Sequence, residues 1–250
     1  MIGESGSRIR ELVFALLQNI PKGRLLEAAA GGGYLASELS NRGFEVTGAD
    51  LVNQWRFSEI PFVVADLDQP LPFEDRSFDV IIFSEGLGYI ENVQSVLREF
   101  HRILKPGGHV VITMPNVFSF QSRLKFLFNG SFRWFPHLPQ IQGDKAALAD
   151  VYRDPTRVTT LHFYLKRTGF SLLKTEFGGG RSLSALAPLG LALQAFTFIE
   201  NIFRKKKKTP LMVNSFPALL FTNVGILASA MTEEATPTKD SESMTGEGIA

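Results

Sequence analysis

The chain has 250 residues, 44% hydrophobic and 20% charged, which suits one globular domain with a sizeable core. A net charge of +1 gives no overall signal for nucleic-acid binding. The absence of cysteine excludes disulfides, thiolate metal sites and a cysteine nucleophile, and it fits a reducing compartment such as the cytoplasm. We expect no metal site, and the first residues do not resemble a secretory signal.

Helix-like and strand-like segments alternate in the first half of the chain. Apolar side chains at helical spacing predict an amphipathic helix over residues 8–20. The further predicted elements are strands over 24–29, 44–49, 61–65, 78–83 and 109–114, and helices over 34–41 and 93–104. This alternation predicts βαβ units and a parallel sheet.

The second half is less regular. Residues 117–150 are rich in Phe and are expected to be mostly loops. A helix is predicted over 156–168, and strands are predicted over 170–177 and 223–231. Residues 232–250 are polar and acidic, and we expect a disordered tail because they cannot bury enough apolar surface.

A long apolar stretch, residues 183–203, precedes the basic run Arg204–Lys208. It fits a soluble cap or dimer helix, an interfacial helix or a membrane span. A span is disfavoured by the polar side chains of Gln194 and Glu200. An apolar helix beside a basic cluster predicts peripheral contact with anionic membranes, which salt would weaken.

The first motif that carries chemistry is the strand and turn LLEAAAGGG, residues 25–33. Glycines after a buried strand let the backbone turn sharply, so a ligand can lie against main-chain atoms. Glu27 precedes the turn, where a buried carboxylate is costly without a partner such as a ligand ammonium. The alternative is a plain tight turn in which Glu27 caps local N–H groups.

Two further acidic residues follow the next strands. Asp50 lies about 20 residues after the glycines, where an acid can accept hydrogen bonds from both hydroxyls of a ribose. Asp66 can accept from an adenine amine, and Leu67 offers an apolar wall and a backbone N–H. Each residue alone also fits an ordinary turn. Together with Glu27 they place three acids on the carboxyl edge of one parallel sheet, where ligands of such sheets bind.

With these residues the chain resembles the class I S-adenosylmethionine-dependent methyltransferases of the UbiE/UbiG-like group. The resemblance is carried by LLEAAAGGG, Asp50, VVADLDQPLPFEDRSFDVIIFSE and LREFHRILKPGGHVVITMPN. It covers residues 8–116 and continues more weakly through YLKRTGFSLLKTEF.

The resemblance implies that S-adenosylmethionine is the cofactor. Glu27 would face the methionine ammonium, and Asp50 would hold the ribose. The other implied contacts are Gly31 and Gly33 beside the methionine, Leu51, Asp66 and Leu67 around the adenine, and Ser84 near the transferred methyl group.

Two departures from the family pattern concern the turn and the base. Ala29 stands where the family has its first glycine, and alanine is tolerable there if its backbone dihedral angles are negative. Gly88-Tyr89 stands where many relatives carry Glu-His, which leaves the catalytic residue unassigned. Tyr89 and His137 are the candidates for a base, although His137 and His162 also fit structural or surface roles.

The expected fold is a three-layer Rossmann-like α/β domain over residues 1–231, with a seven-stranded mixed sheet whose last strand is antiparallel beside the sixth. Residues 115–165 would form a cap, and 182–215 an apolar and basic insertion. The expected reaction is methyl transfer to an O, N or C nucleophile of a small-molecule, lipid or glycan-type acceptor. The alternatives are an NAD(P)-dependent oxidoreductase, because residues 31–36 fit G-x-G-x-x-A, and a non-catalytic cofactor-binding scaffold. The oligomeric state does not follow from the sequence.

Overall fold

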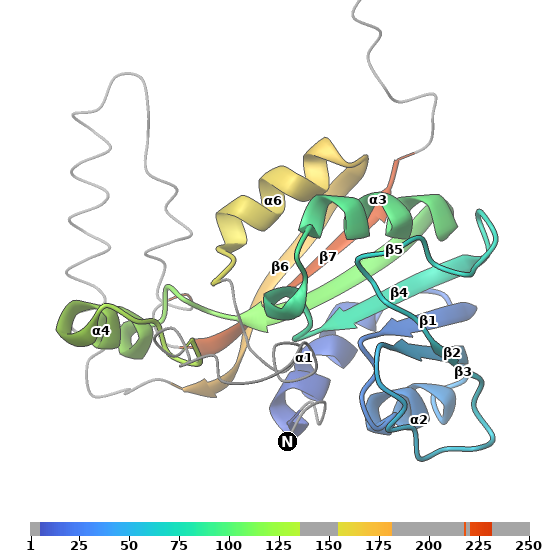
Figure 1. The fold of residues 1–250 in the computed structure, drawn as a ribbon, viewed down its shortest axis with the longest axis horizontal. Helices are drawn as coiled ribbons and strands as arrows, with labels where there is room; N and C mark the ends of the chain where they lie inside the picture. Colours follow the sequence, from blue (N-terminus) through green and yellow to red (C-terminus); the bar gives the residue numbers. More distant parts are fainter. Residues whose placement is uncertain (1–5, 136–154, 182–217, 219–220, 232–250) are drawn as a thin grey trace, which may run out of the picture.

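The computed structural model describes residues 6–135, 155–181, 218 and 221–231, which build one seven-stranded sheet (Figure 1). Its strands are β1 (Arg24–Ala28), β2 (Glu45–Asp50), β3 (Phe62–Val64), β4 (Phe78–Ser84), β5 (Leu104–Pro115), β6 (Phe170–Arg181) and β7 (Phe221–Ala230). The order is β3-β2-β1-β4-β5-β7-β6. The first five strands pair in parallel, and β7 is antiparallel to both β5 and β6. The expected mixed sheet is therefore confirmed.

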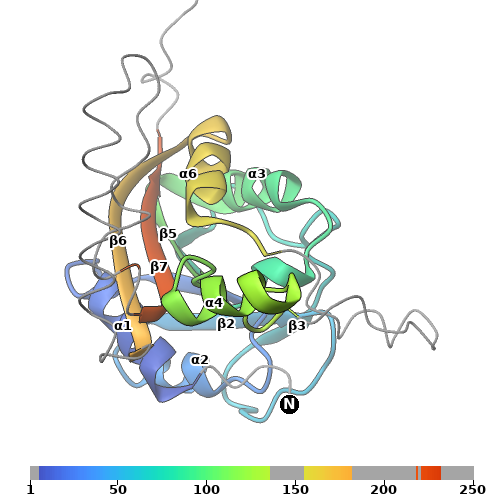
Figure 2. The same ribbon diagram turned by 90° about the vertical axis from the view of Figure 1, so that its left-hand side faces the viewer.

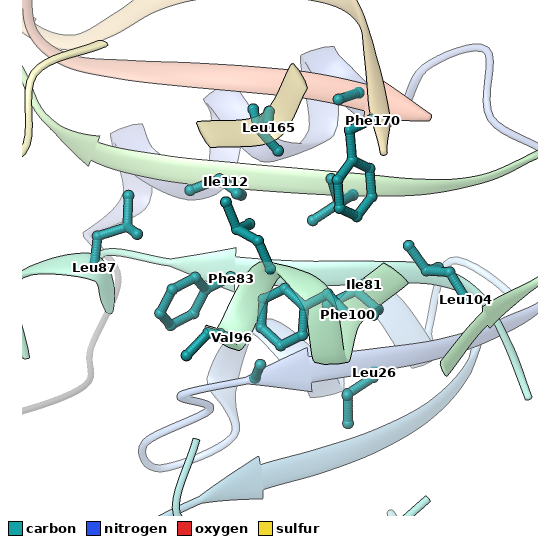
Figure 3. Close-up of a cluster of buried hydrophobic side chains, with 14 of the residues drawn as sticks. Leu26, Ile81, Phe83, Leu87, Val96, Phe100, Leu104, Ile112, Leu165 and Phe170 are labelled. Carbon is teal, nitrogen blue, oxygen red and sulfur yellow. The ribbon is translucent and has the colours of Figure 1, made fainter. Parts of the chain in front are cut away.

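Helices cover both faces of this sheet (Figures 1 and 2). On one face lie α1 (Ser7–Leu17) and α2 (Tyr34–Ser40), and on the other lie α3 (Val93–Ile103) and α6 (Val158–Arg167). Each face buries its own apolar cluster, because successive strand residues point to opposite sides. Phe83, Phe100 and Phe170 belong to the cluster beneath α3 and α6 (Figure 3). Both faces of the central strands are thus buried, as a parallel sheet requires.

The region after β5 differs from the expectation of mostly loops. A helix, α4 (Phe120–Asn129), follows the strand, with the Ser119 side chain accepting from the Ser122 N–H at its start. Gly130, at φ +69°, ends the helix in the left-handed conformation that glycine adopts without strain. The sequence pattern was misleading because the large apolar side chains of α4 do not face the core. His137, the 182–215 insertion and the 232–250 tail lie outside the described residues.

The loop between β3 and β4 is held to α3 by Arg102. Its guanidinium donates to the carbonyl oxygens of Leu71 (3.1 Å) and Phe73 (2.9 Å). It also pairs with the carboxylates of Asp75 (2.6 Å) and Glu99 (2.8 Å). Glu99 in turn accepts from the Leu71 N–H at 3.0 Å. The conspicuous PLPFEDRS and LREFHRI segments therefore recognise each other and fix the entry into β4.

A second anchor lies at the opposite, amino-terminal edge of the sheet. Asp79 accepts from Lys105 Nζ (2.7 Å) and from the Arg24 N–H (2.9 Å), so it joins the starts of β1, β4 and β5. Gly107 has φ +77°, and a Cβ on Gly108 would lie 2.9 Å from the Lys105 carbonyl oxygen. The LKPGG segment is therefore structural, and it lies far along the strands from the acidic residues at their carboxyl ends.

We expect Arg102→Ala to lower the free energy of unfolding by about 2 kcal/mol, since it leaves a carboxylate and two carbonyl groups without their donor. Urea denaturation followed by circular dichroism measures the change. Arg98→Ala is the matched control, because Arg98 is an exposed arginine on the same helix. Equal stability of the two variants would contradict the anchoring role of Arg102.

Candidate functional site

The turn after β1 is strained at a residue that is not glycine. The chain reverses through residues 29–33, where Gly31 has φ +54° and Gly33 has φ +83°. Ala29 has φ +58°, so the condition under which alanine would be tolerated here without strain, negative dihedral angles, is not met. A left-handed alanine costs about 1–2 kcal/mol because its Cβ crowds the next carbonyl oxygen. At Gly33, a Cβ would lie 2.8 Å from the Trp55 ring, so this position also excludes side chains.

The structure joins the glycine turn to the end of β2. The Gly31 N–H donates to Asp50 Oδ2 at 2.7 Å, across 19 residues of sequence. The other carboxylate oxygen of Asp50 is 3.4 Å from the Val52 nitrogen. Leu51 and Val52 are about half exposed beside it. A polar group and an apolar surface therefore adjoin the turn, as a ribose and an adenine ring would require.

Glu27 is the most unusual titratable residue at this edge. Its side chain is 3% exposed, and Oε2 has no hydrogen-bond partner within the described residues. Burial raises the pKa of Glu27 to about 8; the Ala36 N–H opposes this shift and the nearby charge of Asp50 adds to it. The alternative in which Glu27 caps local N–H groups therefore explains the hydrogen bond from Ala36, but it leaves Oε2 without a partner. An ionised Glu27 needs a cation at Oε2.

The two residues predicted after β3 have different surroundings, since Asp66 is exposed and Leu67 is buried. Asp66 accepts from the Asp68 N–H at 2.9 Å within its own turn. Asp68 accepts from the N–H groups of Glu91 and Asn92, which ties the turn to the start of α3. Leu67 is buried and lines a cavity of about 360 Å³ on the α3 side. This cavity contains neither Asp50 nor the glycine turn, so it is not the predicted cofactor cleft.

A polar cluster lies at the carboxyl ends of β4 and β5. Ser84, predicted near the transferred methyl group, is buried with its hydroxyl 2.9 Å from that of Thr113. Glu85 follows directly and accepts from Asn223 Nδ2 of β7 at 3.2 Å. The pKa of Glu85 is raised to about 7. Burial is the larger effect and raises the pKa, and the hydrogen bonds with Thr113 and Asn223 partly oppose it. The sequence prediction missed Glu85, yet the signal was present, because an acid directly follows the strand.

The structure describes two of the residues considered as a base or as structural histidines, Tyr89 and His162. Tyr89 ends the short 3-10 helix η1 (Leu87–Tyr89), four residues after Glu85, and is partly exposed. His162 on α6 lies 3.1 Å from the Thr175 hydroxyl, and burial lowers its pKa, which fits the structural role expected for it.

A family described as a methyltransferase domain matches residues 5–175, more than half of the chain. The chain belongs to this family. It is a class I S-adenosylmethionine-dependent methyltransferase, and this assignment favours methyl transfer over the oxidoreductase and scaffold alternatives.

Individual relatives agree with the family. The methyltransferase is similar to the demethylmenaquinone methyltransferase of Renibacterium salmoninarum, with 33% identity over 42% of this chain and 46% of the relative. It is also similar to the ubiquinone/menaquinone biosynthesis C-methyltransferase UbiE of Coxiella burnetii, with 37% identity over 36% of this chain and 41% of the relative. The chain therefore spans less than half of the length of these curated relatives.

Solved structures show the same fold. The structure of an S-adenosylmethionine-dependent methyltransferase from Archaeoglobus fulgidus has a TM-score of 0.57 and 17% identity, and the match covers 88% of this chain and 94% of that one. A methyltransferase of Haloferax volcanii, solved in complex with the Trm112 activator, also has a TM-score of 0.57, with 18% identity over 88% of this chain and 89% of that one.

S-adenosylmethionine is the cofactor, and the residues at the carboxyl edge fit it. When bound, it supplies a methyl group on a positively charged sulfur. We propose that its ammonium group pairs with Glu27 Oε2, the buried oxygen that has no partner among the described residues. Asp50 keeps lone pairs for the ribose hydroxyls beyond its bond to Gly31, and Leu51 presents an apolar surface to the adenine.

Cofactor binding should release a proton from Glu27. With a pKa of about 8, Glu27 is mostly protonated at about pH 7 without a ligand, whereas a bound ammonium favours the carboxylate. We expect calorimetry with S-adenosylhomocysteine to show close to one proton released when phosphate and Tris buffers are compared. In Glu27→Gln the release should disappear and affinity should fall about 10- to 100-fold.

The same ionisation sets the stability of the ligand-free protein. The pKa of Glu27 is raised from 4.5 to about 8 in the folded state, so stability should fall as pH rises across this window. Glu27→Gln should flatten that fall in a series of thermal melts at different pH values.

In the calorimetry experiment, binding heats that do not depend on the buffer would overturn the pairing of Glu27 with the ammonium.

Proposed function

We propose that this methyltransferase acts on a carbon or oxygen atom of a lipid-like, quinol-type acceptor at a membrane surface. The names of its relatives, which are demethylmenaquinone and quinone methyltransferases, support this acceptor class. The observation that carries the proposal is the outer face of α4. The sequence also left amines and glycans open as acceptors, and these are the alternatives that the acceptor experiment below must exclude.

Helix α4 directs its apolar face away from the core that the described residues form. Leu124, Leu127 and Phe128 follow the i, i+3, i+4 spacing of one helix face, and Leu127 and Phe128 are 76% and 78% exposed. Ser122, on the opposite face, is buried, and its hydroxyl accepts from the Arg133 N–H. A helix in water normally shows the reverse pattern, so this face fits an apolar partner.

The charges around α4 favour an anionic surface. Residues 115–135 contain Arg123, Lys125 and Arg133 but no Asp or Glu. Arg133 lies over the ring of Trp134, which is 59% exposed. Exposed aromatic and apolar side chains beside cations are typical of helices that lie in a membrane interface. No helix in the described part of the chain has the length and apolar character to cross a bilayer.

The position of α4 connects this surface to the polar cluster. Strand β5 ends at Pro115, and α4 begins five residues later at the carboxyl edge of the sheet (Figure 1). Asn116 fixes the connection, since its N–H donates to the Thr222 carbonyl oxygen and its amide donates to that of Phe221. An acceptor held in the interface would therefore lie beside the edge that carries Ser84 and Glu85.

The acceptor class can be tested by methyl transfer from labelled S-adenosylmethionine. The panel should contain a short-chain demethylmenaquinol, a simple phenol, an alkylamine and a glycan, with the products identified by mass spectrometry. We expect a methylated quinol and little transfer to the amine. Transfer to the amine or glycan alone would contradict the proposed acceptor.

Membrane contact through α4 can be tested by flotation with anionic and neutral vesicles at low and high salt. We expect binding to the anionic vesicles that salt weakens. A Leu127→Ser, Phe128→Ser double variant should lose binding, because it removes most of the exposed apolar area. The matched control is Leu173→Ser, which changes an exposed leucine on β6 instead. If the double variant binds vesicles as the unaltered protein does, α4 is not the membrane contact. The same result is expected if residues 183–203 make the contact instead.

A further inference from the structure

We infer that Glu85 is the general base that accepts the proton of the acceptor's hydroxyl group during methyl transfer. This role rests on the proposed function, because it requires an acceptor with an acidic hydroxyl, such as a quinol or a phenol. It replaces Tyr89 and His137 as the leading candidate. Three observations carry it, namely the position of Glu85, the orientation of its partners and the conformation of its backbone.

The strand register places Glu85 beside the cofactor turn. Ala28, the last residue of β1, pairs with Phe83 in β4, so Glu85 lies two residues beyond that pair, level with the start of the glycine turn. On its other side, the Glu85 N–H donates to the Thr113 carbonyl oxygen of β5 at 3.0 Å. Glu85 therefore stands between the segment proposed to hold the methionine part of the cofactor and the connection to α4.

Two partners of the Glu85 carboxyl group, Asn223 and Thr113, are neutral and oriented. Asn223 is buried, and its Oδ1 accepts from the Thr222 hydroxyl at 3.0 Å. That bond turns the amide nitrogen of Asn223 toward Glu85 Oε1. Thr113 is fully buried and also hydrogen-bonds to the Glu85 side chain. Both donors are neutral, so each holds the carboxyl group in place while stabilising its charge less than an arginine or lysine would.

The backbone of Glu85 is strained, and such strain is frequent at functional sites. Its φ of +57° is a left-handed conformation that costs about 1–2 kcal/mol in a residue with a Cβ. Glycine would relieve this strain, yet the chain has glutamate. The pKa of about 7 suits the role, because a base works best when its pKa lies near the working pH. The residue as a whole is partly exposed, although its carboxyl group is largely desolvated.

The proposed step is balanced without a further reactant. The acceptor's hydroxyl proton moves to a carboxylate oxygen of Glu85, while the acceptor's oxygen or conjugated ring carbon forms a bond to the methyl carbon. The bond between sulfur and the methyl carbon breaks, and its electron pair stays on the sulfur. After attack through carbon, the ring carbon loses its proton and the oxygen regains one. One proton per turnover therefore leaves through Glu85 to solvent in either case.

Kinetics of Glu85→Gln provide the first test, with a short-chain demethylmenaquinol and a phenol as acceptors. We expect kcat/KM of the unaltered enzyme to rise with pH through an inflection near about pH 7, and the variant to lose about 100-fold or more together with that inflection. S-adenosylhomocysteine affinity should not change. Glu45→Gln makes the same chemical change at the amino-terminal end of β2, and it should alter neither property.

Two further measurements guard against a folding defect and an unsuitable acceptor. Glu85→Gly removes the carboxyl group while relieving the left-handed strain, so it should melt at the same temperature or higher and remain inactive. Carbon-13 NMR of the glutamate carboxyl groups, with S-adenosylhomocysteine bound, should show a signal titrating near about pH 7 that Glu85→Gln removes.

The outcomes separate the two proposals. If none of the hydroxyl-bearing acceptors is methylated, the proposed function fails, while the NMR titration still decides whether Glu85 has the properties of a base. Full activity of either folded variant would overturn the role of Glu85, as would a Glu85 carboxyl signal that titrates at the ordinary glutamate pKa.

Discussion

The parallel alignment of β1, β2 and β4 is the constraint on which the rest of this site depends. Ala28 at the end of β1 pairs with Ala49 on one side and with Phe83 on the other. The residues that follow these strands must therefore emerge at the same edge. Such strands persist only if both of their faces are buried, which explains why helices cover the sheet on both sides. The apolar core thus determines where the acidic side chains meet.

Stability and function rest on different residues along the same strands. Arg102 and Asp79, in the segments that identify the family, hold loops and strand starts in place through several hydrogen bonds each. The carboxyl edge instead carries features that lower stability, namely the left-handed Ala29 and the buried Glu27. Strain and unsatisfied polar atoms concentrate at sites that bind ligands, because a ligand compensates for them.

Two carboxyl groups at this edge have raised pKa values and suit different tasks. Glu27 is enclosed, with one oxygen lacking a partner, so its ionisation requires a cation from a ligand. Glu85 has neutral donors from two strands and remains partly exposed, so it can exchange a proton near neutral pH. The surroundings of each group, rather than its chemical type, separate a binding role from a proton-transfer role.

The sequence by itself determined the alternation of strands and helices, the three acidic strand ends and the family, because each appears as a short pattern of neighbouring residues. It also led, through the resemblance, to the antiparallel last strand. It could not predict the left-handed φ of Ala29, because backbone conformation in a turn depends on how the two flanking elements are placed. The outward apolar face of α4 was hidden for a related reason, since periodicity does not reveal which face is covered. Only the tertiary structure brought Asn223 to Glu85 across 138 residues, because a contact of that range depends on the completed sheet.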